Sequence, residues 1–263
     1  MNIDGKRVLI TGGSSGIGLE MARLLLTSGA KVAITGRRGD ALADAVAQLG
    51  QGVVSIQGDV ADAQVRSAML SRVTEELGGL DILVNNAGGV RAGRLENTSE
   101  SEIRQMIDVD LVAPILLTRE TLPLLRASGD ALIVNVSSSI ALVGLPFYAT
   151  YAAAKSGLAH FGESLRRELS GEGIGVLTVY PTATDTPMMQ TSGLARDGGR
   201  ETASVVAAHV IEAIRSGAIE VVRGDKERLA MVALNKADPA TVDAAFVKQK
   251  DAIEAAARDH SAL

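Results

Sequence analysis

The chain has 263 residues, which is long enough for one large domain or two small ones. Hydrophobic residues make up 46% and charged residues 22%, a balance typical of a folded protein and unlike that of a disordered one. The net charge of −5 gives no general attraction to nucleic acid or to an anionic membrane surface. Aromatic residues make up only 2%, which argues against base stacking as a main activity. We therefore expect no nucleic-acid partner.

Cysteine is absent, which excludes a disulfide framework, a thiol nucleophile and a cysteine-based zinc site. With only three histidines a His-rich metal site is not expected either, so no metal is predicted. The first ten residues carry charge where a signal peptide needs an apolar stretch. No apolar run reaches the roughly 18 residues that a membrane span requires. These features predict a cytoplasmic protein with no membrane partner.

Short apolar segments rich in β-branched residues alternate with longer segments of helical spacing. The expected strands are Val8–Ile10, Val32–Ile34, Val53–Ile56, Ile82–Val84, Ala131–Val136, Val176–Val179 and Ile219–Val222. The expected helices include Leu19–Thr27, Ala41–Leu49, Asp62–Leu77, Glu100–Leu125 and Ala152–Leu169. The strand segments are mostly apolar rather than alternating, as in strands covered on both faces. The alternation predicts an α/β fold with a parallel sheet wrapped on both faces by helices.

The pattern changes after Val222. Residues 224–263 are expected to form two more helices, divided near Asp238 and Pro239. No linker or fixed-period repeat separates this segment from the rest. We expect one domain, in which 224–263 is a C-terminal helical appendage on residues 1–223.

A glycine-rich turn follows the first expected strand and leads into a helix. Such a turn directs helix N–H groups and the positive end of the helix dipole toward an anion, and its glycines let the backbone approach a pyrophosphate. The spacing is Gly-x3-Gly-x-Gly rather than the usual G-x-G-x-x-G. The candidate dinucleotide-binding residues are Gly12, Ser14, Ser15, Gly16, Ile17 and Gly18. A glycine-rich turn without a ligand is the alternative.

The end of the second strand indicates which dinucleotide binds. An NAD site usually carries an acidic residue there, about 20 residues after the glycines, to bind the ribose 2′-hydroxyl. This chain has Gly36-Arg37-Arg38 instead. The planar guanidinium pairs well with phosphate oxygens, so NADP(H) is favoured over NAD(H). Two solvated surface arginines are the alternative.

Tyr151 and Lys155 lie four residues apart, which places them on one face of a helix. A phenol has an ordinary pKa near 10, and a neighbouring ammonium lowers it. The pair can then move a proton to or from a carbonyl or alcohol oxygen. Ser138 follows the strand Ala131–Val136, and its hydroxyl could hydrogen-bond the reacting oxygen.

Together these residues resemble the short-chain dehydrogenase/reductase family. The matching motifs are Thr11–Gly18, Asp59-Val60, Asn85-Asn86-Ala87-Gly88, Ser138, Tyr151-x-x-x-Lys155 and Pro181-x-x-x-x-Thr186. The resemblance covers residues 5–223 and implies a seven-stranded, doubly wound Rossmann sheet. It also implies hydride transfer between a nicotinamide cofactor and a carbonyl/alcohol pair. The further cofactor contacts that it implies are Asp59 and Val60 at the adenine, Asn86, Ala87 and Gly88 along the cleft, Pro181, Thr184 and Thr186 at the nicotinamide half, and Tyr151 and Lys155, the latter at the ribose.

The same resemblance implies a substrate lid at about residues 187–200 and a homodimer or homotetramer formed through the helices at 100–125 and 152–170. The lid and residues 141–150 are expected to shape the substrate pocket. Their apolar members, which suggest an apolar carbonyl substrate, are Leu142, Val143, Leu145, Phe147, Met188 and Met189. Tyr148 is expected either to face the substrate or to pack within its loop. Ser137 and Ser139 are expected to bond to the backbone.

Two positions depart from the family pattern. Asp110 stands where the family usually has an asparagine that holds a water linked to the lysine, and Thr182 stands where it usually has a glycine. The first could alter the proton relay, and Asp110 is therefore added to the candidate catalytic residues. The second could alter the backbone beside the nicotinamide. The stretches 110–114 and 181–186 are most similar to the DltE-like oxidoreductase subgroup.

The sequence thus predicts an NADP(H)-dependent carbonyl reductase or alcohol dehydrogenase that acts on a small carbonyl or alcohol compound. Tyr151 is the expected acid/base, Ser138 orients the substrate oxygen, and Lys155 lowers the pKa of Tyr151. The alternative is a dinucleotide-binding sensor or scaffold that kept the fold and lost turnover, for which Asp110 and Thr182 are the support.

Overall fold

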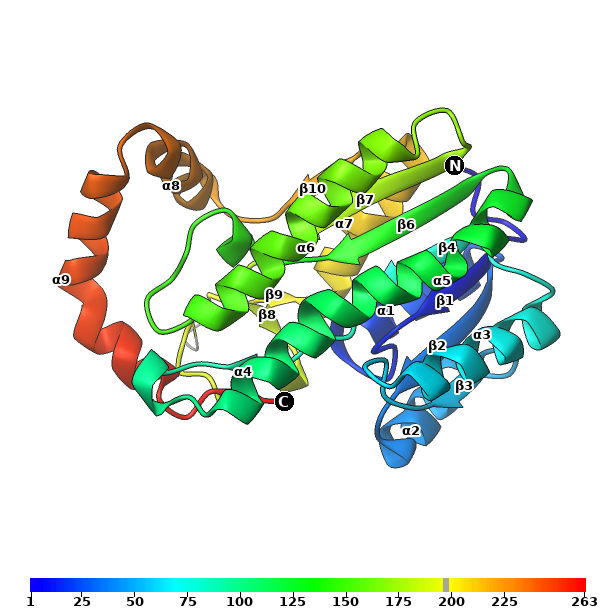
Figure 1. The fold of residues 1–263 in the computed structure, drawn as a ribbon, viewed down its shortest axis with the longest axis horizontal. Helices are drawn as coiled ribbons and strands as arrows, with labels where there is room; N and C mark the ends of the chain where they lie inside the picture. Colours follow the sequence, from blue (N-terminus) through cyan, green and yellow to red (C-terminus); the bar gives the residue numbers. More distant parts are fainter. Residues whose placement is uncertain (196–198) are drawn as a thin grey trace.

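The computed structural model describes residues 1–195 and 199–263. Its centre is a parallel sheet of seven strands in the order β10-β7-β6-β4-β1-β2-β3 (Figure 1). The strands are β1 (Arg7–Ile10), β2 (Lys31–Gly36), β3 (Val54–Gln57), β4 (Ile82–Asn85), β6 (Ala131–Val136), β7 (Ile174–Tyr180) and β10 (Glu220–Val222). Each expected strand is confirmed, with ends that differ by a few residues. The order reverses direction at β1, so a crevice is expected outside the carboxyl ends of β1 and β4.

Helices cover both faces of this sheet, as the apolar strands predict. The main helices are α1 (Gly16–Thr27), α2 (Gly39–Leu49), α3 (Ala63–Leu77), α4 (Glu100–Ile107), α5 (Ala113–Ser128), α6 (Ala149–Glu168) and α7 (Ala203–Ser216). One buried cluster joins α1, α2 and α7 to one face of the strands, and a second joins α3, α5 and α6 to the other face. In Figure 1, α5 and α6 lie in front of the sheet. The doubly wound α/β fold expected from the sequence is therefore confirmed.

The helix expected at Glu100–Leu125 is divided. A π-helical turn, Asp108–Val112, separates α4 from α5. Pro114 explains the break, since proline has no N–H to donate to the carbonyl four residues earlier, which is that of Asp110. Single π turns inside α-helices recur at functional sites. The turn matters here because it carries Asp110.

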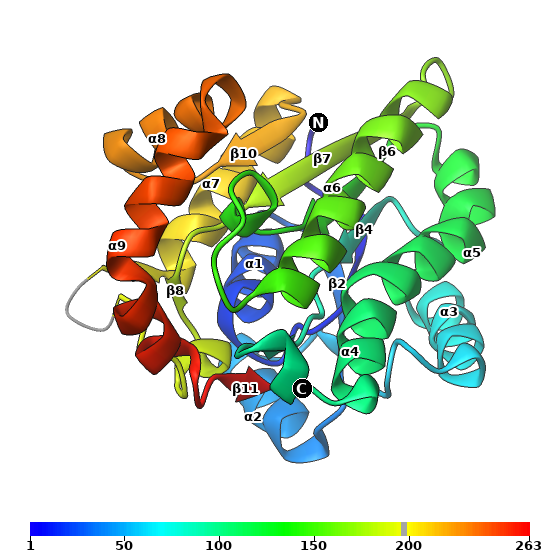
Figure 2. The same cartoon turned by 60° about the vertical axis from the view of Figure 1, so that its left-hand side comes forward.

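The C-terminal segment forms α8 (Lys226–Ala237) and α9 (Pro239–Ala257), with the break where it was expected. Figures 1 and 2 show both helices beyond the β10 edge of the sheet, with α9 running back toward α4. The chain then forms β11 (Ser261–Ala262), which pairs antiparallel with β5 (Val90–Arg91) just after β4. Two further short strands, β8 (Thr184–Asp185) and β9 (Glu201–Thr202), pair in parallel. These four short strands were not predicted.

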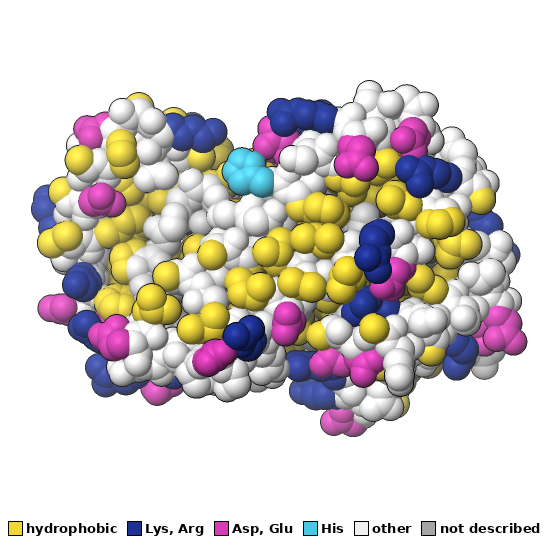
Figure 3. Space-filling model, in the orientation of Figure 1, with side chains coloured by type: hydrophobic (Ala, Val, Ile, Leu, Met, Phe, Trp, Pro, Cys, Tyr) yellow, Lys and Arg dark blue, Asp and Glu magenta, His cyan; other side chains and the backbone are white. Residues whose placement is uncertain are grey.

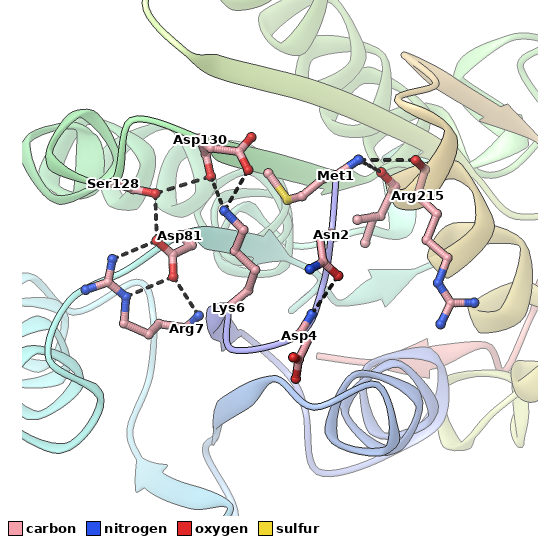
Figure 4. A network of polar contacts seen from close by, with 10 residues as sticks. Met1, Asn2, Asp4, Lys6, Arg7, Asp81, Ser128, Asp130 and Arg215 are labelled. Carbon is pink, nitrogen blue, oxygen red and sulfur yellow. Dashed lines mark hydrogen bonds and ion pairs between the residues drawn. The ribbon is translucent and has the colours of Figure 1, made fainter.

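A polar network joins the amino ends of three central strands (Figure 4). Arg7 binds the Asp81 carboxylate through its side chain and its backbone N–H, at 2.7–2.8 Å. The Ser128 hydroxyl donates to the same carboxylate at 2.6 Å, and Lys6 forms an ion pair with Asp130 at 2.7 Å. These contacts hold the starts of β1, β4 and β6 together.

Candidate active site

A cleft of about 990 Å³ opens at the carboxyl ends of the parallel strands. Its walls include the segments that follow β1, β2, β3, β4, β6, β7 and β10, part of α6, and the chain after α9. Every candidate site residue except Gly18 and Asp110 lines it directly: Gly12, Ser14, Ser15, Gly16, Ile17, Arg37, Arg38, Asp59, Val60, Asn86, Ala87, Gly88, Ser138, Tyr151, Lys155, Pro181, Thr184 and Thr186. The structure thus brings the separate sequence motifs into one place.

The glycine turn packs tightly against the loop after β4. Gly12 has a φ of +64°, and a Cβ there would lie 2.9 Å from the Cα of Ala87. A Cβ on Gly18 would lie 2.5 Å from the side-chain nitrogen of Asn86. This nitrogen donates to the carbonyls of Thr11, at 2.9 Å, and Gly12, at 3.1 Å. Gly18 and Asn86 therefore shape the turn, in addition to any contact that Asn86 makes with a cofactor.

The amino end of α1 is suited to an anion. Ser15 stands at the N-cap position but makes no side-chain cap hydrogen bond, and the first turn contains no acidic residue. The first N–H groups of a helix have no intrahelical partner and carry partial positive charge. Since Ser15, Gly16 and Ile17 line the cleft, these groups fit the diphosphate of a dinucleotide.

Arg37 and Arg38 follow β2 at one end of the cleft. Both side chains are exposed, and neither forms an ion pair with any residue in 1–195 or 199–263. Val60 is buried on the neighbouring wall, and the Asp59 carboxylate accepts a hydrogen bond from the backbone N–H of Ala61 at 2.9 Å. Two guanidiniums without an acidic partner among the described residues therefore lie at this end of the cleft, next to Asp59 and Val60.

Tyr151 and Lys155 lie one turn apart on α6, with the lysine nitrogen 5.8 Å from the centre of the tyrosine ring. Lys155 is buried, and its ammonium donates to the carbonyl of Val136 at 3.2 Å. Ser138 lies just beyond the end of β6, and its hydroxyl accepts a hydrogen bond from the backbone N–H of Ile140 at 3.3 Å. The side chain of Ser137 bonds to the carbonyl of Lys155 at 2.8 Å, so this serine positions α6 rather than a substrate.

Asp110 is fully buried and lies against Lys155, with 3.0 Å between carboxylate oxygen and ammonium nitrogen. Its carboxylate also accepts from the backbone N–H of Gly89, at 3.2 Å. Burial raises the pKa of Asp110, while Lys155 and the Gly89 amide act in the opposite direction. The π turn thus delivers a carboxylate to the lysine, behind the wall of the cleft.

The pKa of Tyr151 differs from the sequence expectation. Lys155 lowers it, as expected, and a hydrogen bond with Ser138 lowers it further. Burial of the phenol is the largest influence, however, and together with the charge of Asp110 it raises the pKa above the ordinary value. Burial also disfavours the ammonium of Lys155, but Asp110 and Tyr151 outweigh it, so the pKa of Lys155 is raised. At neutral pH, Tyr151 therefore holds its proton and Lys155 its charge.

The segment after β7 completes the nicotinamide side. Thr186 packs on the glycine turn, with its methyl carbon 2.9 Å from where a Cβ of Gly16 would lie. Thr184 is buried, and its hydroxyl donates to the carbonyl of Thr182 at 2.9 Å. Among the residues described, Thr182 is not one of those with a left-handed φ, so this backbone accepts threonine in place of glycine without strain.

The substrate side of the cleft contains residues that the sequence analysis did not identify. His260 is buried beside β11, where its Nδ1 accepts from the Tyr148 hydroxyl at 2.9 Å and its Nε2 donates to the carbonyl of Met188 at 3.0 Å. Burial lowers the pKa of His260, which keeps the ring neutral, and burial raises the pKa of Tyr148 to about 12. Ala262 and Leu263 line the same wall. No local pattern marks these residues, because the contacts join positions more than 70 residues apart.

Part of the expected lid lies outside the described residues, namely 196–198. Of the apolar residues expected to shape the pocket, Leu145, Met188 and Met189 line the cleft, and Leu142, Val143 and Phe147 do not. Tyr148 lines the cleft, and its hydroxyl is hydrogen-bonded to His260. The Ser139 hydroxyl accepts a hydrogen bond from the side chain of Arg228 at 3.2 Å, in place of the backbone bond that was expected.

No cluster of three or more His, Cys, Asp or Glu side chains that could hold a metal occurs within the described part of the chain. Across the same residues, no helix is both long and apolar enough to cross a membrane.

The doubly wound sheet, the glycine turn and the Tyr–Lys pair in one cleft define a Rossmann-type oxidoreductase. The chain matches the family model described as short chain dehydrogenase over residues 6–197. It belongs to this family, whose members bind a nicotinamide cofactor. The resemblance inferred from the sequence motifs is therefore confirmed.

Similar proteins and a solved structure support the same family assignment. The chain is 32% identical to the ketoacyl reductase HetN of Nostoc over 252 residues, 92% of this chain and 88% of the relative. It is 36% identical to the uncharacterized oxidoreductase DltE of Bacillus subtilis over 194 residues, 73% of this chain and 77% of the relative. The crystal structure of a 3-ketoacyl-(acyl-carrier-protein) reductase from Brucella melitensis complexed with NADH is 26% identical. It superposes with a TM-score of 0.79 and covers 84% of this chain and 97% of that one.

Proposed function

We propose that this protein is an NADP(H)-dependent reductase of a small carbonyl compound. The observation that carries the proposal is the pair of Tyr151, partly buried, and Lys155, buried, on α6, in the same cleft as an uncapped helix end and two unpaired arginines. Two of the similar proteins named above are ketoacyl reductases by name, which supports reduction of a carbonyl group. Apolar side chains of Leu145, Met188 and Met189 in the cleft support a largely apolar substrate body.

In this proposal Tyr151 is the general acid. Its raised pKa supports this role, because a phenol that keeps its proton at neutral pH can donate it to a carbonyl oxygen. The Ser138 hydroxyl orients that oxygen, and the Lys155 ammonium stabilises the phenolate that remains. The bound dinucleotide supplies a hydride to the carbonyl carbon, so the product is an alcohol. The reverse reaction needs the phenolate and is favoured at high pH.

The cofactor preference rests on Arg37 and Arg38. A 2′-phosphate would be held between their guanidiniums, with the diphosphate on the amino end of α1 and the adenine near Asp59 and Val60. Asn86, Ala87, Gly88, Pro181, Thr184 and Thr186 would line the remaining length of the dinucleotide.

We further propose that residues 224–263 belong to the same domain, because β11 pairs with β5 and Ala257 packs into a buried cluster with Val90 and Tyr148. A homodimer or homotetramer through residues 100–125, which form α4, the π turn and most of α5, and through α6 is part of the proposal. Val112 is 37% exposed, and Leu116 and Phe161 are only partly buried. Figure 3 shows hydrophobic side chains over the face that these helices form. The cytoplasmic location stays a prediction.

The test is consumption of NADPH and NADH with a panel of ketones and aldehydes, combined with binding of each cofactor measured by fluorescence. The proposal expects NADPH-dependent turnover. Tight binding of NADPH with no turnover of any compound would favour a sensor or scaffold, and preference for NADH would contradict the cofactor assignment.

A further inference from the structure

Arg228 brings a cation from the C-terminal appendage into the cleft. It lies in the first turn of α8 and lines the cleft beside Ser139, Thr182 and Gly224. One terminal nitrogen donates to the Ser139 hydroxyl at 3.2 Å. The Nε is buried and has no hydrogen-bond partner among residues 1–195 and 199–263. Among the described residues the guanidinium thus makes one side-chain hydrogen bond, and its buried Nε makes none.

The two other cations that line this side of the cleft are each paired with a carboxylate. Arg223 pairs with Glu201 through several hydrogen bonds, and Lys155 pairs with Asp110. Arg228 has no carboxylate within ion-pair distance in the part of the chain that the structure describes. The carboxylate of Asp225 is used as the helix cap and accepts from the backbone N–H of Arg228 at 2.8 Å.

A partly buried guanidinium such as that of Arg228 is unfavourable when no carboxylate pairs with it. Burial works against its charge, which is why the pKa of Arg228 is lowered despite the nearby Asp225. A partly buried charge without a partner costs free energy, and a ligand that supplies the opposite charge recovers it. The planar guanidinium is suited to two oxygens of one carboxylate or phosphate.

The strand order places Arg228 far from the adenine end. Arg228 follows β10, whereas Arg37 and Arg38 follow β2, and four strands separate β10 from β2 in the sheet. At about 4.8 Å per strand this distance exceeds 20 Å. Ser139, which Arg228 contacts, directly follows Ser138 in the chain. The guanidinium thus faces the substrate half of the cleft.

We propose that Arg228 binds an anionic group, a carboxylate or a phosphate, carried by the substrate itself. The inference rests on the proposed function and narrows its substrate class. The substrate is a carbonyl compound with one anionic group held at Arg228 and an apolar part beside Leu145, Met188 and Leu194. An apolar wall alone would predict a neutral substrate.

The experiment uses two matched pairs of carbonyl compounds. One pair is 4-oxopentanoate and its methyl ester, and the other is dihydroxyacetone phosphate and dihydroxyacetone. The values of kcat and KM are measured with NADPH for the wild type, Arg228→Gln and Arg228→Lys. Lys226→Gln is the matched control, because Lys226 is exposed on the same helix turn and its loss changes the net charge equally.

The wild type should prefer the anionic member of at least one pair, and which pair shows the preference identifies carboxylate or phosphate. In Arg228→Gln, kcat/KM for that anion should fall about tenfold to a hundredfold, mainly through KM, as expected for loss of a charged hydrogen bond. The neutral member should change less than about twofold, Arg228→Lys should retain part of the preference, and Lys226→Gln all of it. Equal use of both members by the wild type, or an unchanged preference in Arg228→Gln, would overturn the inference.

A second measurement separates this inference from the proposed function. The dissociation constants of the same four compounds are measured by calorimetry with NADPH-loaded protein, and thermal unfolding confirms that each variant is folded. If no compound is reduced but the anion binds the wild type more tightly than Arg228→Gln, the anion site stands and the reductase proposal fails. If the anion binds both proteins equally, the anion site is wrong.

Discussion

At the amino ends of the central strands Lys6, Arg7, Asp81 and Asp130 are paired (Figure 4), whereas at the carboxyl ends Arg37, Arg38 and Arg228 have no acidic partner among the described residues. Both groups lie on the same seven-stranded sheet. Paired charges hold strands in place and leave nothing for a ligand to satisfy, while unpaired charges in a cleft have free donors. At the amino ends the paired charges serve the fold. At the carboxyl ends, where Lys155 and Arg223 are paired as well, we infer that the unpaired arginines serve binding.

The largest expected effect at the carboxyl end comes from Tyr151→Phe. The change removes only a hydroxyl, so the packing of α6 and the glycine turn should survive. Turnover should fall by ~10²–10⁴-fold, the usual contribution of general acid–base catalysis. NADPH affinity by fluorescence and turnover by absorbance are measured on the same preparation. Near-normal turnover would show that another group donates the proton.

The second-largest expected effect concerns the preference for NADPH over NADH. Arg37→Ala should lower the NADPH/NADH ratio of kcat/KM by about tenfold or more, because a charge-assisted phosphate contact contributes roughly 1.5–3 kcal/mol. Arg126→Ala is the matched control at the opposite end of the sheet, where the arginine pairs with Glu172. Its ratio should equal that of the wild type. If both variants shift the ratio equally, general charge rather than a phosphate contact is responsible.

At the amino end the effect should appear in stability instead. Asp81→Asn removes the charge that Arg7 and Ser128 bind, and should lower the free energy of unfolding by about 1.5–3 kcal/mol. Arg7 and Ser128 hold the pKa of Asp81 well below its usual range, although burial opposes them. A carboxyl with a depressed pKa stabilises the fold above its unfolded pKa of about 4 and loses that contribution as the pH falls further.

Urea unfolding from pH 7 down to pH 3 measures this contribution. The difference between wild type and Asp81→Asn should be largest near neutral pH and should shrink below about pH 4. The NADPH/NADH ratio of the variant should be unchanged. A changed ratio with unchanged stability would break the division between the two ends.

Features that depend on neighbouring residues could be predicted from the sequence, and features that depend on distant contacts could not. The seven strands and the glycine turn were predictable because each depends on a short run of residues, and Tyr151 and Lys155 because helical spacing fixes their common face. The positions of His260 and Arg228 were not, because they depend on how the appendage folds back over the cleft. The π turn was not predicted either. Its one sign in the sequence is Pro114, which lacks an N–H, and helical periodicity alone does not show that the helix breaks there.

The net pKa of Tyr151 could not be predicted either. Sequence spacing places Lys155 beside the phenol and so gives the influence that lowers the pKa. The opposing influences, burial and the charge of Asp110, depend on the packing of the π turn against α6. The effect of Asp110 on the pKa of Tyr151 therefore becomes clear only from the structure.

The smallest expected effect is the one that tests this coupling, and it concerns pH rather than rate. Asp110→Asn keeps the shape of the side chain and removes its charge. Without that charge the phenolate of Tyr151 is repelled less, so its pKa should fall, and the pKa of Lys155 should fall as well because its ammonium loses a partner at 3.0 Å. Alcohol oxidation needs the phenolate, so the rise of kcat/KM with pH should move to lower pH in the variant.

Asp108→Asn is the control. Asp108 is an exposed aspartate on the same turn, and its substitution should leave the pH profile in place. Profiles that coincide for Asp110→Asn and the wild type would show that Asp110 is protonated or uncoupled, because burial already raises its pKa.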